Sequence, residues 1–198
     1  MWDERFSTED YVFGTAPAAF LADHSAYLTP GTRTLAVADG EGRNSVFMAE
    51  RGLDVVAMDA SPVGLQKAQA LAATRGVSVD FRQSDIATWD WDGEVFDLVV
   101  AVFIQFMDPV TRATAFAGMK HCLKPGGVLM LHGFTPKQLE YRTGGPGNID
   151  FLYTEALLRD AFGALEIERL QSHDRVLGEG PGHSGLSALI DLVARKPD

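Results

Sequence analysis

The chain contains 198 residues, of which 46% are hydrophobic and 22% are charged, as in ordinary globular proteins. Its formal net charge of −10 repels phosphate backbones, so we expect no nucleic-acid partner. The length fits one domain over residues 1–198 with a sizeable core.

Cysteine usage and hydropathy bear on the compartment. The single cysteine, Cys122, excludes an internal disulfide and is typical of a reducing environment. The N-terminus lacks the basic start and apolar stretch of a signal peptide. The longest apolar run, residues 98–104, is far too short to cross a bilayer. We therefore expect a cytoplasmic protein with no membrane partner, and the sequence leaves a monomer and a homodimer open.

The N-terminal segment is rich in aromatic residues. Residues 1–16 carry Trp2, Phe6, Tyr11 and Phe13. We interpret this segment as an arm that either covers a site as a lid or packs on the core, since aromatic side chains bury large areas. A helix is expected next, over residues 17–28, with Pro17 in its first turn.

Strands and helices then alternate along the chain. The expected strands cover residues 34–38, 53–58, 77–82, 96–103 and 128–131, and the expected helices cover residues 43–51, 62–75 and 109–123. Residues 124–127 (KPGG) are expected to form a tight turn before the last of these strands. Repeated strand–helix units predict a parallel sheet with helices on both faces. Ligands of such sheets bind at the carboxyl ends of the strands, where the strand order reverses.

The pattern changes after Gly133. Residues 134–150 contain several glycines and prolines and are expected to form a long substrate-side loop with one short helix. A helix over residues 154–162 follows, and then two strands over residues 165–173 and 186–194. The connection between these strands is too short for a helix, so they should pair antiparallel. The predicted fold is a Rossmann-like, doubly wound α/β domain with seven strands, mostly parallel, ending in an antiparallel hairpin.

Residues 35–45 (LAVADGEGRNS) are the most informative segment. Gly40 and Gly42 lack a Cβ, so the backbone there allows close approach of a ligand. The helix that begins at Arg43 would direct free N–H groups toward that ligand. Asp59 lies 19 residues after Gly40, close to the spacing of about 20 at which an acid binds a ribose hydroxyl. These features predict a ligand that contains adenosine.

Further motifs narrow the choice of ligand. They are residues 39–45, the acid Asp59, residues 84–86 (SDI), residues 96–97 (FD) and residues 123–127 (LKPGG). In this order they resemble the class I S-adenosylmethionine-dependent methyltransferases, over about residues 30–135. Residues 40–45 and residues 2–6 (WDERF) resemble in particular the branch that contains tellurite-resistance and thiopurine methyltransferases.

The resemblance implies S-adenosylmethionine as cofactor and S-adenosylhomocysteine as product. It implies that the glycine loop contacts the methionine part, that Asp59 binds the ribose and that Asp85 accepts a hydrogen bond from adenine. The phenyl ring of Phe103, with Val102, would lie under the sulfonium. The full set of implied cofactor contacts is Ala38, Asp39, Gly40, Gly42, Asn44, Asp59, Ala60, Ser84, Asp85, Ile86, Val102 and Phe103.

Two positions depart from the family pattern. The family usually has an acid on its first strand and a glycine two residues before Gly40, where this chain has Ala36 and Ala38. If the acid's contact with the cofactor amino group is lost, Asp39 or Glu41 is the candidate to replace it.

The chemistry of the acceptor decides whether a base is needed. An amine or a hydroxyl usually requires one, whereas a soft sulfur, selenium or tellurium nucleophile does not. By analogy with the nearest branch, we expect a small-molecule acceptor with such a soft atom. The base candidates are His132, Tyr141 and His183. The residues expected at the substrate or in the lid are Trp2, Arg5, Phe6, Tyr11, Phe13, Gln105, Tyr141 and Arg142.

Three other interpretations stay open. The first is an O- or N-methyltransferase with His132 as base. The second is a non-catalytic protein that binds S-adenosylmethionine or a nucleotide, which Ala36 and Ala38 permit. The third is a nicotinamide oxidoreductase, disfavoured because Ser45 stands at the third glycine position of that fingerprint. The spacing of His, Cys and acidic residues predicts no metal site.

Overall fold

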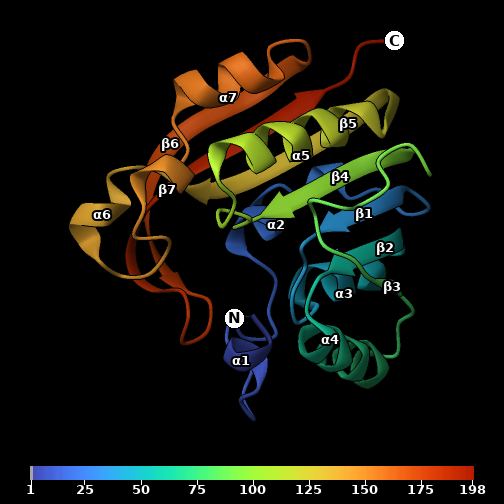
Figure 1. The fold of residues 1–198 in the computed structure, drawn as a ribbon. Helices are drawn as coiled ribbons and strands as arrows, with labels where there is room; N and C mark the ends of the chain where they lie inside the picture. Colours follow the sequence, from blue (N-terminus) through green and yellow to red (C-terminus); the bar gives the residue numbers. More distant parts are fainter. Residues whose placement is uncertain (1) are drawn as a thin grey trace.

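A computed structural model describes residues 2–198. All seven strands belong to one sheet, in the order β3-β2-β1-β4-β5-β7-β6 (Figure 1). Neighbouring strands from β3 to β5 are parallel, whereas β7 pairs antiparallel with both β5 and β6. The strands are β1 (Arg33–Val37), β2 (Asp54–Asp59), β3 (Asp80–Gln83), β4 (Phe96–Val102), β5 (Leu123–Phe134), β6 (Glu166–Gly178) and β7 (Ser184–Arg195). The predicted fold class is therefore confirmed.

Helices cover both faces of the sheet. One face carries α5 and α7, whose buried side chains join one core cluster, and the other carries α2 and α3, with α4 beside α3 (Figure 1). The central strands are buried on both faces, which explains their nearly continuous apolar sequences. The helices are α1 (Trp2–Phe6), α2 (Ala19–Asp23), α3 (Arg43–Glu50), α4 (Pro62–Arg75), α5 (Pro109–His121), α6 (Gln138–Tyr141) and α7 (Glu155–Phe162).

Local sequence sets the ends of the longer helices. The Ser61 side chain accepts a hydrogen bond from the Gly64 N–H at 3.0 Å and so caps α4, whose first residue is Pro62. The left-handed Gly76, with φ of +68°, ends the same helix. The Val77 N–H bonds the Ala72 carbonyl at that end, so β3 starts at Asp80 and not at residue 77 as predicted.

Two further boundaries differ from the sequence prediction. The helix expected over residues 17–28 is only α2 followed by a 3₁₀ turn at Ser25–Tyr27. The N-cap Ala18 has no side chain that can cap α2, and the His24 ring bonds the Phe20 carbonyl at 2.8 Å. The turn expected at residues 124–127 lies inside β5, as an irregular stretch in which Gly126 has φ of +73°.

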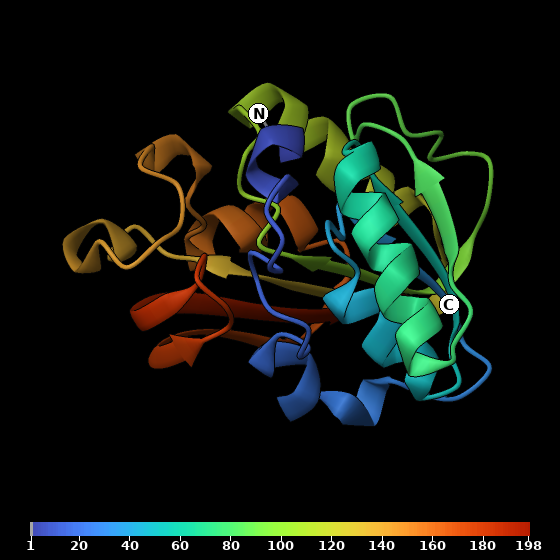
Figure 2. The ribbon, with the colours of Figure 1, turned by 90° about the horizontal axis from the view of Figure 1, so that it is seen from below.

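The N-terminal arm forms a short helix that the sequence did not predict. Seen from below, α1 and the chain after it run between α4 and the β6–β7 hairpin (Figure 2). No helix within residues 2–198 combines the length and the hydropathy needed to cross a membrane.

Candidate active site

A cavity of about 490 Å³ lies at the carboxyl ends of β1, β2 and β4. The strand order reverses at this place, because β2 lies on one side of β1 and β4 on the other. This is where ligands of doubly wound sheets bind. The N-terminal arm, residues 145–148 and the β6–β7 hairpin complete its wall.

The loop between β1 and α3 forms one end of this cavity. Ala38, Asp39 and Gly40 line it, and so does Asn44 from the first turn of α3. Gly42 lies outside the lining: with φ of +88° it is the N-cap of α3, and an added Cβ would lie 2.6 Å from the Ala68 Cβ. Gly42 therefore serves helix packing, whereas Gly40 presents backbone to the cavity.

Asp59 fixes this loop from the end of β2. One carboxylate oxygen accepts the Gly40 N–H at 2.8 Å, and the other accepts the Ser61 N–H at 2.8 Å. Burial raises the pKa of Asp59, and the two N–H donors oppose that rise. A carboxylate has about four acceptor positions, so Asp59 keeps acceptor capacity toward the cavity.

Asp39 is a second carboxylate at this end. It accepts hydrogen bonds from the Ser45 hydroxyl and, at 3.3 Å, from the Ser45 N–H. Burial raises the pKa of Asp39 to about 7, and the charge of Asp59 adds to the rise. Asp39 thus changes its charge near neutral pH.

Glu41 has different partners. Its carboxylate pairs with the Lys67 ammonium at 2.5 Å and accepts the Val12 N–H at 2.8 Å. Glu41 does not line the cavity. Of the two candidates to replace the missing strand-one acid, only Asp39 therefore lines the cavity.

The loop after β3 adds a third carboxylate. Ser84, Asp85 and Ile86 all line the cavity, as does Ala60 after β2. One Asp85 oxygen accepts the Ala87 N–H at 2.8 Å, so this residue also caps the turn that follows. Asp39, Asp59 and Asp85 make this end of the cavity acidic.

Aromatic rings and a histidine form the opposite end. The Phe103 ring centroid lies 4.2 Å from the His183 ring and 4.6 Å from the Phe134 ring. The Phe13 ring of the arm also lies near His183, with the two ring centroids 4.5 Å apart. Phe103 has φ of +57°, a left-handed conformation that costs about 1–2 kcal/mol in a residue with a Cβ. Val102 lines the same wall.

His183 is buried in this aromatic surrounding. Its Nδ1 atom has no hydrogen-bond partner within residues 2–198. Burial, together with the nearby charges of Arg43 and Arg5, lowers the pKa of His183 to about 3. The ring is therefore neutral at neutral pH and has little power to accept a proton.

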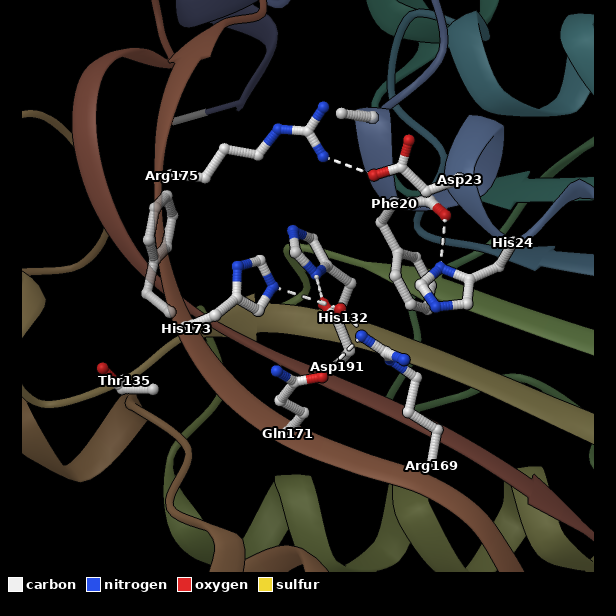
Figure 3. Close-up of polar contacts among 12 residues, drawn as sticks. Phe20, Asp23, His24, His132, Thr135, Arg169, Gln171, His173, Arg175 and Asp191 are labelled. Atoms are coloured by element: carbon white, nitrogen blue, oxygen red, sulfur yellow. Dashed lines mark hydrogen bonds and ion pairs between the residues drawn. The ribbon is translucent and has the colours of Figure 1, made fainter.

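His132 lies outside the cavity lining. Its Nδ1 atom is 2.7 Å from an Asp191 carboxylate oxygen, and the other Asp191 oxygen is 3.1 Å from His173 Nε2 (Figure 3). The His132 ring stacks on Phe20 of α2 at 4.8 Å and meets the edge of Phe103 at 4.7 Å. It therefore lies behind the cavity wall, in a polar cluster on the sheet.

The N-terminal arm places four of its predicted residues at the cavity. They are Trp2, Arg5, Phe6 and Phe13. Gln105 also lines it, but its side chain binds backbone groups of Phe134.

Three other residues predicted for the lid or the substrate lie outside the lining. The Tyr11 hydroxyl bonds the Lys67 carbonyl, and the Tyr141 hydroxyl bonds Asp174 on the surface. Arg142 ends α6 in a left-handed conformation, with φ of +55°.

Some lining residues escaped the sequence analysis. Phe106 and Phe151 are two of them. Pro146 and Asn148 also line the cavity, but they belong to residues 134–150, which the sequence predicted as a substrate-side loop.

Arg43 also lines the cavity and is paired with Glu179 of the distant β6–β7 hairpin at 2.8 Å. From the sequence alone, its charge makes it, with Arg5 and Arg142, a candidate to meet an anionic substrate, with a solvated surface as the alternative for each. Within the described residues no group of three or more His, Cys, Asp or Glu side chains is arranged to hold a metal ion.

Sequence comparison agrees with this geometry. Residues 35–127 match the model of a family described as a methyltransferase domain. This match, over just under half of the chain, and the fold support the class I S-adenosylmethionine-dependent methyltransferase that the motifs predict.

Individual relatives show how far the likeness extends. A ubiquinone biosynthesis O-methyltransferase from Cereibacter sphaeroides is 33% identical over 124 residues, which are 61% of this chain and 49% of that protein. The chain thus spans about half the length of this curated relative. TehB from Haemophilus influenzae superposes with a TM-score of 0.75 at 19% identity, over 98% of this chain and 67% of that one. A second structure is described as the conversion of a disulfide bond into a thioacetal group during echinomycin biosynthesis. It superposes with a TM-score of 0.76 at 20% identity, over 98% of this chain and 89% of that one.

Proposed function

We propose that this protein binds S-adenosylmethionine at the acidic end of the cavity and methylates a small molecule at a soft sulfur, selenium or tellurium atom. The observation that carries the choice of acceptor is the aromatic end, where the one titratable ring, His183, is neutral and a very weak base. An acceptor that must lose its proton to the protein has no suitable partner there.

The acidic end suits the cofactor. Its carboxylates are Asp39, Asp59 and Asp85, and S-adenosylmethionine carries a sulfonium and an ammonium. In this proposal Asp59 accepts from the ribose hydroxyls and Asp85 from the adenine amino group, with Ile86 on the adenine ring. Asp39 receives the ammonium of the cofactor. It replaces the acid that the family usually has on its first strand, where this chain has Ala36. The backbone at Gly40 passes the methionine part, and the missing Cβ lets the Phe6 ring of the arm pack on this loop, since an added Cβ would lie 3.2 Å from it.

The aromatic end orients the acceptor and excludes water. When bound, S-adenosylmethionine would supply an electrophilic methyl group: the acceptor's lone pair forms a bond to the methyl carbon, the bond from that carbon to the sulfonium breaks, and S-adenosylhomocysteine leaves. The rings of Phe13, Phe103 and Phe134 hold the acceptor body, and His183 offers it a hydrogen bond. Alignment of acceptor and methyl group supplies much of the rate in such a displacement. Since a thiolate or a reduced selenium atom is already strongly nucleophilic, these residues need not transfer a proton.

An O-methyltransferase is the second candidate, because a relative with 33% identity has that name. For an O-methyltransferase, the sequence predicts His132 as the catalytic base. This ring lies behind Phe103 and bonds Asp191, which weighs against that role.

The test separates these possibilities and the binding-only alternative. Calorimetric titration should give binding of S-adenosylmethionine and S-adenosylhomocysteine and none of NAD; the reverse result contradicts the proposal. Thiols, selenite and phenols are then offered with labelled cofactor. Methylated thiol or selenium products are expected, and His132→Asn should leave their rate within about threefold. Methylation of phenols alone, lost in His132→Asn, establishes the O-methyltransferase instead. Binding without any methylated product from the whole panel indicates a binding protein.

A further inference from the structure

Charges are unevenly distributed inside the cavity. The acidic end carries the three carboxylates described above, and the guanidinium groups of Arg5 and Arg43 lie over the Phe13 ring, with Cζ 5.1 and 6.0 Å from its centroid. The charge of Arg43 also acts on Asp39, so only Arg5 is separate from the acidic end. Both guanidinium charges also lower the pKa of His183. This concentration of positive charge stands out in a chain with a net charge of −10.

The two arginines differ in their partners. Arg43 is buried and its charge is neutralised by Glu179, with an N–O distance of 2.8 Å. Arg5 is exposed, and it forms no ion pair within residues 2–198, although Asp3 and Glu4 precede it in α1. The free positive charge at the aromatic end therefore belongs to Arg5.

Aromatic rings hold the Arg5 guanidinium at the cavity. Its Cζ atom lies 5.2 Å from the Trp2 ring centroid and 5.1 Å from the Phe13 ring centroid. Both distances are within the range of a cation–π contact. Phe13 in turn contacts His183. An arginine held between two lining rings keeps its N–H donors available for a planar anionic group.

We propose that Arg5 is a specificity-determining residue that selects methyl acceptors carrying an anionic group, with a carboxylate as the simplest case. This inference rests on the proposed function and adds the charge of the acceptor to it. The acceptor's apolar body packs between the rings of Phe13, Phe103 and Phe134, and its anionic group lies toward Arg5. The acidic end repels the same anion, so the charge distribution also fixes the direction in which the acceptor enters.

A pair of thiols that differ only in charge tests the proposal. In 3-mercaptopropionate the group distal to sulfur is a carboxylate, and in 3-mercaptopropionamide it is a neutral amide of the same size. For the wild-type protein we expect a KM for the carboxylate on the order of tenfold lower than for the amide, as for a charge-assisted hydrogen bond. Arg5→Gln should bring the two KM values within about twofold by raising the value for the carboxylate. Arg5→Lys should keep part of the preference.

Arg51 provides the matched control. Its Cζ atom lies 5.3 Å from the Phe47 ring centroid, it is exposed, and it does not line the cavity. Arg51→Gln removes the same charge from a similar aromatic contact and should leave the KM ratio at its wild-type value. Added salt should weaken the preference in the wild type, because screening acts on an exposed cation.

Binding measured without turnover separates this inference from the proposed function. Calorimetry of the S-adenosylhomocysteine complex with each thiol should give tighter binding of the carboxylate in the wild type and in Arg51→Gln, and no preference in Arg5→Gln. Equal binding and equal KM values for the two thiols in the wild type overturn the role of Arg5 and leave methyl transfer intact. An Arg5-dependent preference in binding without methylated product supports the anion site and contradicts thiol methylation.

Discussion

The two ends of the cavity are built in different ways. The acidic end comes from short segments that each follow a strand of one sheet, and the backbone carries much of it. The aromatic end brings together side chains from the N-terminal arm, the segment after β4, the last residue of β5 and the β6–β7 hairpin. In the proposed function, cofactor binding therefore depends on the sheet itself, whereas acceptor choice depends mainly on the segments that connect or precede its strands.

Removal of the carboxylate of Asp59 should have the largest effect on the acidic end. Asp59→Ala removes the acceptor for two backbone N–H groups and the proposed ribose contact. We expect the dissociation constant for S-adenosylmethionine to rise about 100-fold by calorimetry, which corresponds to about 2.7 kcal/mol. Asp59→Asn keeps one acceptor oxygen and should weaken the binding of S-adenosylmethionine less than Asp59→Ala does. Asp80→Ala, at the exposed start of β3, is the control with wild-type affinity. If Asp59→Ala binds S-adenosylmethionine with wild-type affinity, the acidic end is not the cofactor site.

A substitution at the other end should affect the acceptor alone. His183→Phe keeps an aromatic ring between Phe13 and Phe103 and removes the hydrogen-bonding nitrogens. We expect the acceptor KM to rise about tenfold, as for the loss of one hydrogen bond, with no change in the dissociation constant for S-adenosylhomocysteine. Steady-state kinetics measures the acceptor KM, and calorimetry on the same preparation measures the dissociation constant for S-adenosylhomocysteine. If cofactor affinity falls as well, the two ends are not independent.

The pH dependence of cofactor affinity should report Asp39. Its pKa of about 7 means that the carboxylate is mostly protonated at pH 6 and mostly charged at pH 8. If only the charged form binds the cofactor ammonium, affinity rises about tenfold between these pH values. Asp39→Asn should bind weakly at both and lose this dependence, which calorimetry at several pH values measures.

The same group has the opposite effect on the free protein. The folded pKa of Asp39 lies above its ordinary value of 3.8, so the unfolded chain loses this proton first as pH rises. The free energy of unfolding should therefore fall between about pH 4 and pH 7, and saturating S-adenosylhomocysteine should reverse the fall. Urea unfolding of the wild type and of Asp39→Asn, with and without S-adenosylhomocysteine, measures this. A wild-type profile that matches the variant would exclude Asp39 as the titrating group.

The sequence predicted the residues of the acidic end better than those of the aromatic end. The loop at residues 38–40 and the acids Asp59 and Asp85 reach the cavity as predicted, because each follows directly from a strand whose apolar pattern is clear. Placement at the aromatic end depends on tertiary contacts that no local pattern encodes. His132 and His183 are similar candidates in sequence, yet the first lies behind Phe103 and the second lines the cavity. Gly42 and Tyr11 belong to recognisable motifs but pack against α4.

A smaller effect is expected when the contacts that attach the N-terminal arm to Lys67 of α4 are removed. The Lys67 ammonium bonds the carbonyls of Phe6, Thr8 and Asp10 at 2.7 to 3.2 Å and pairs with Glu41. The double variant Lys67→Met with Glu41→Gln removes these bonds without leaving a buried charge unpaired. We expect amide hydrogens of residues 2–13 to exchange several-fold faster, with exchange in the sheet unchanged, as mass spectrometry can resolve. Protection equal to the wild type would mean that the aromatic contacts alone hold the arm.

The smallest expected effect is at Ala38, where the acidic end departs from its family. This residue has φ of +49°, a left-handed conformation in which a Cβ costs about 1–2 kcal/mol, and its position lines the cavity. Ala38→Gly relieves that cost but gives the unfolded chain more freedom, which offsets about 0.4–1 kcal/mol. The net free energy of unfolding should rise by between about 0 and 1.6 kcal/mol, as urea denaturation measures. Because the removed methyl group belongs to a lining residue, cofactor affinity should rise slightly, while the acceptor KM stays constant. A fall in stability would mean that the surroundings of Ala38 have adapted to its methyl group, so that this loop depends on side-chain packing as the aromatic end does.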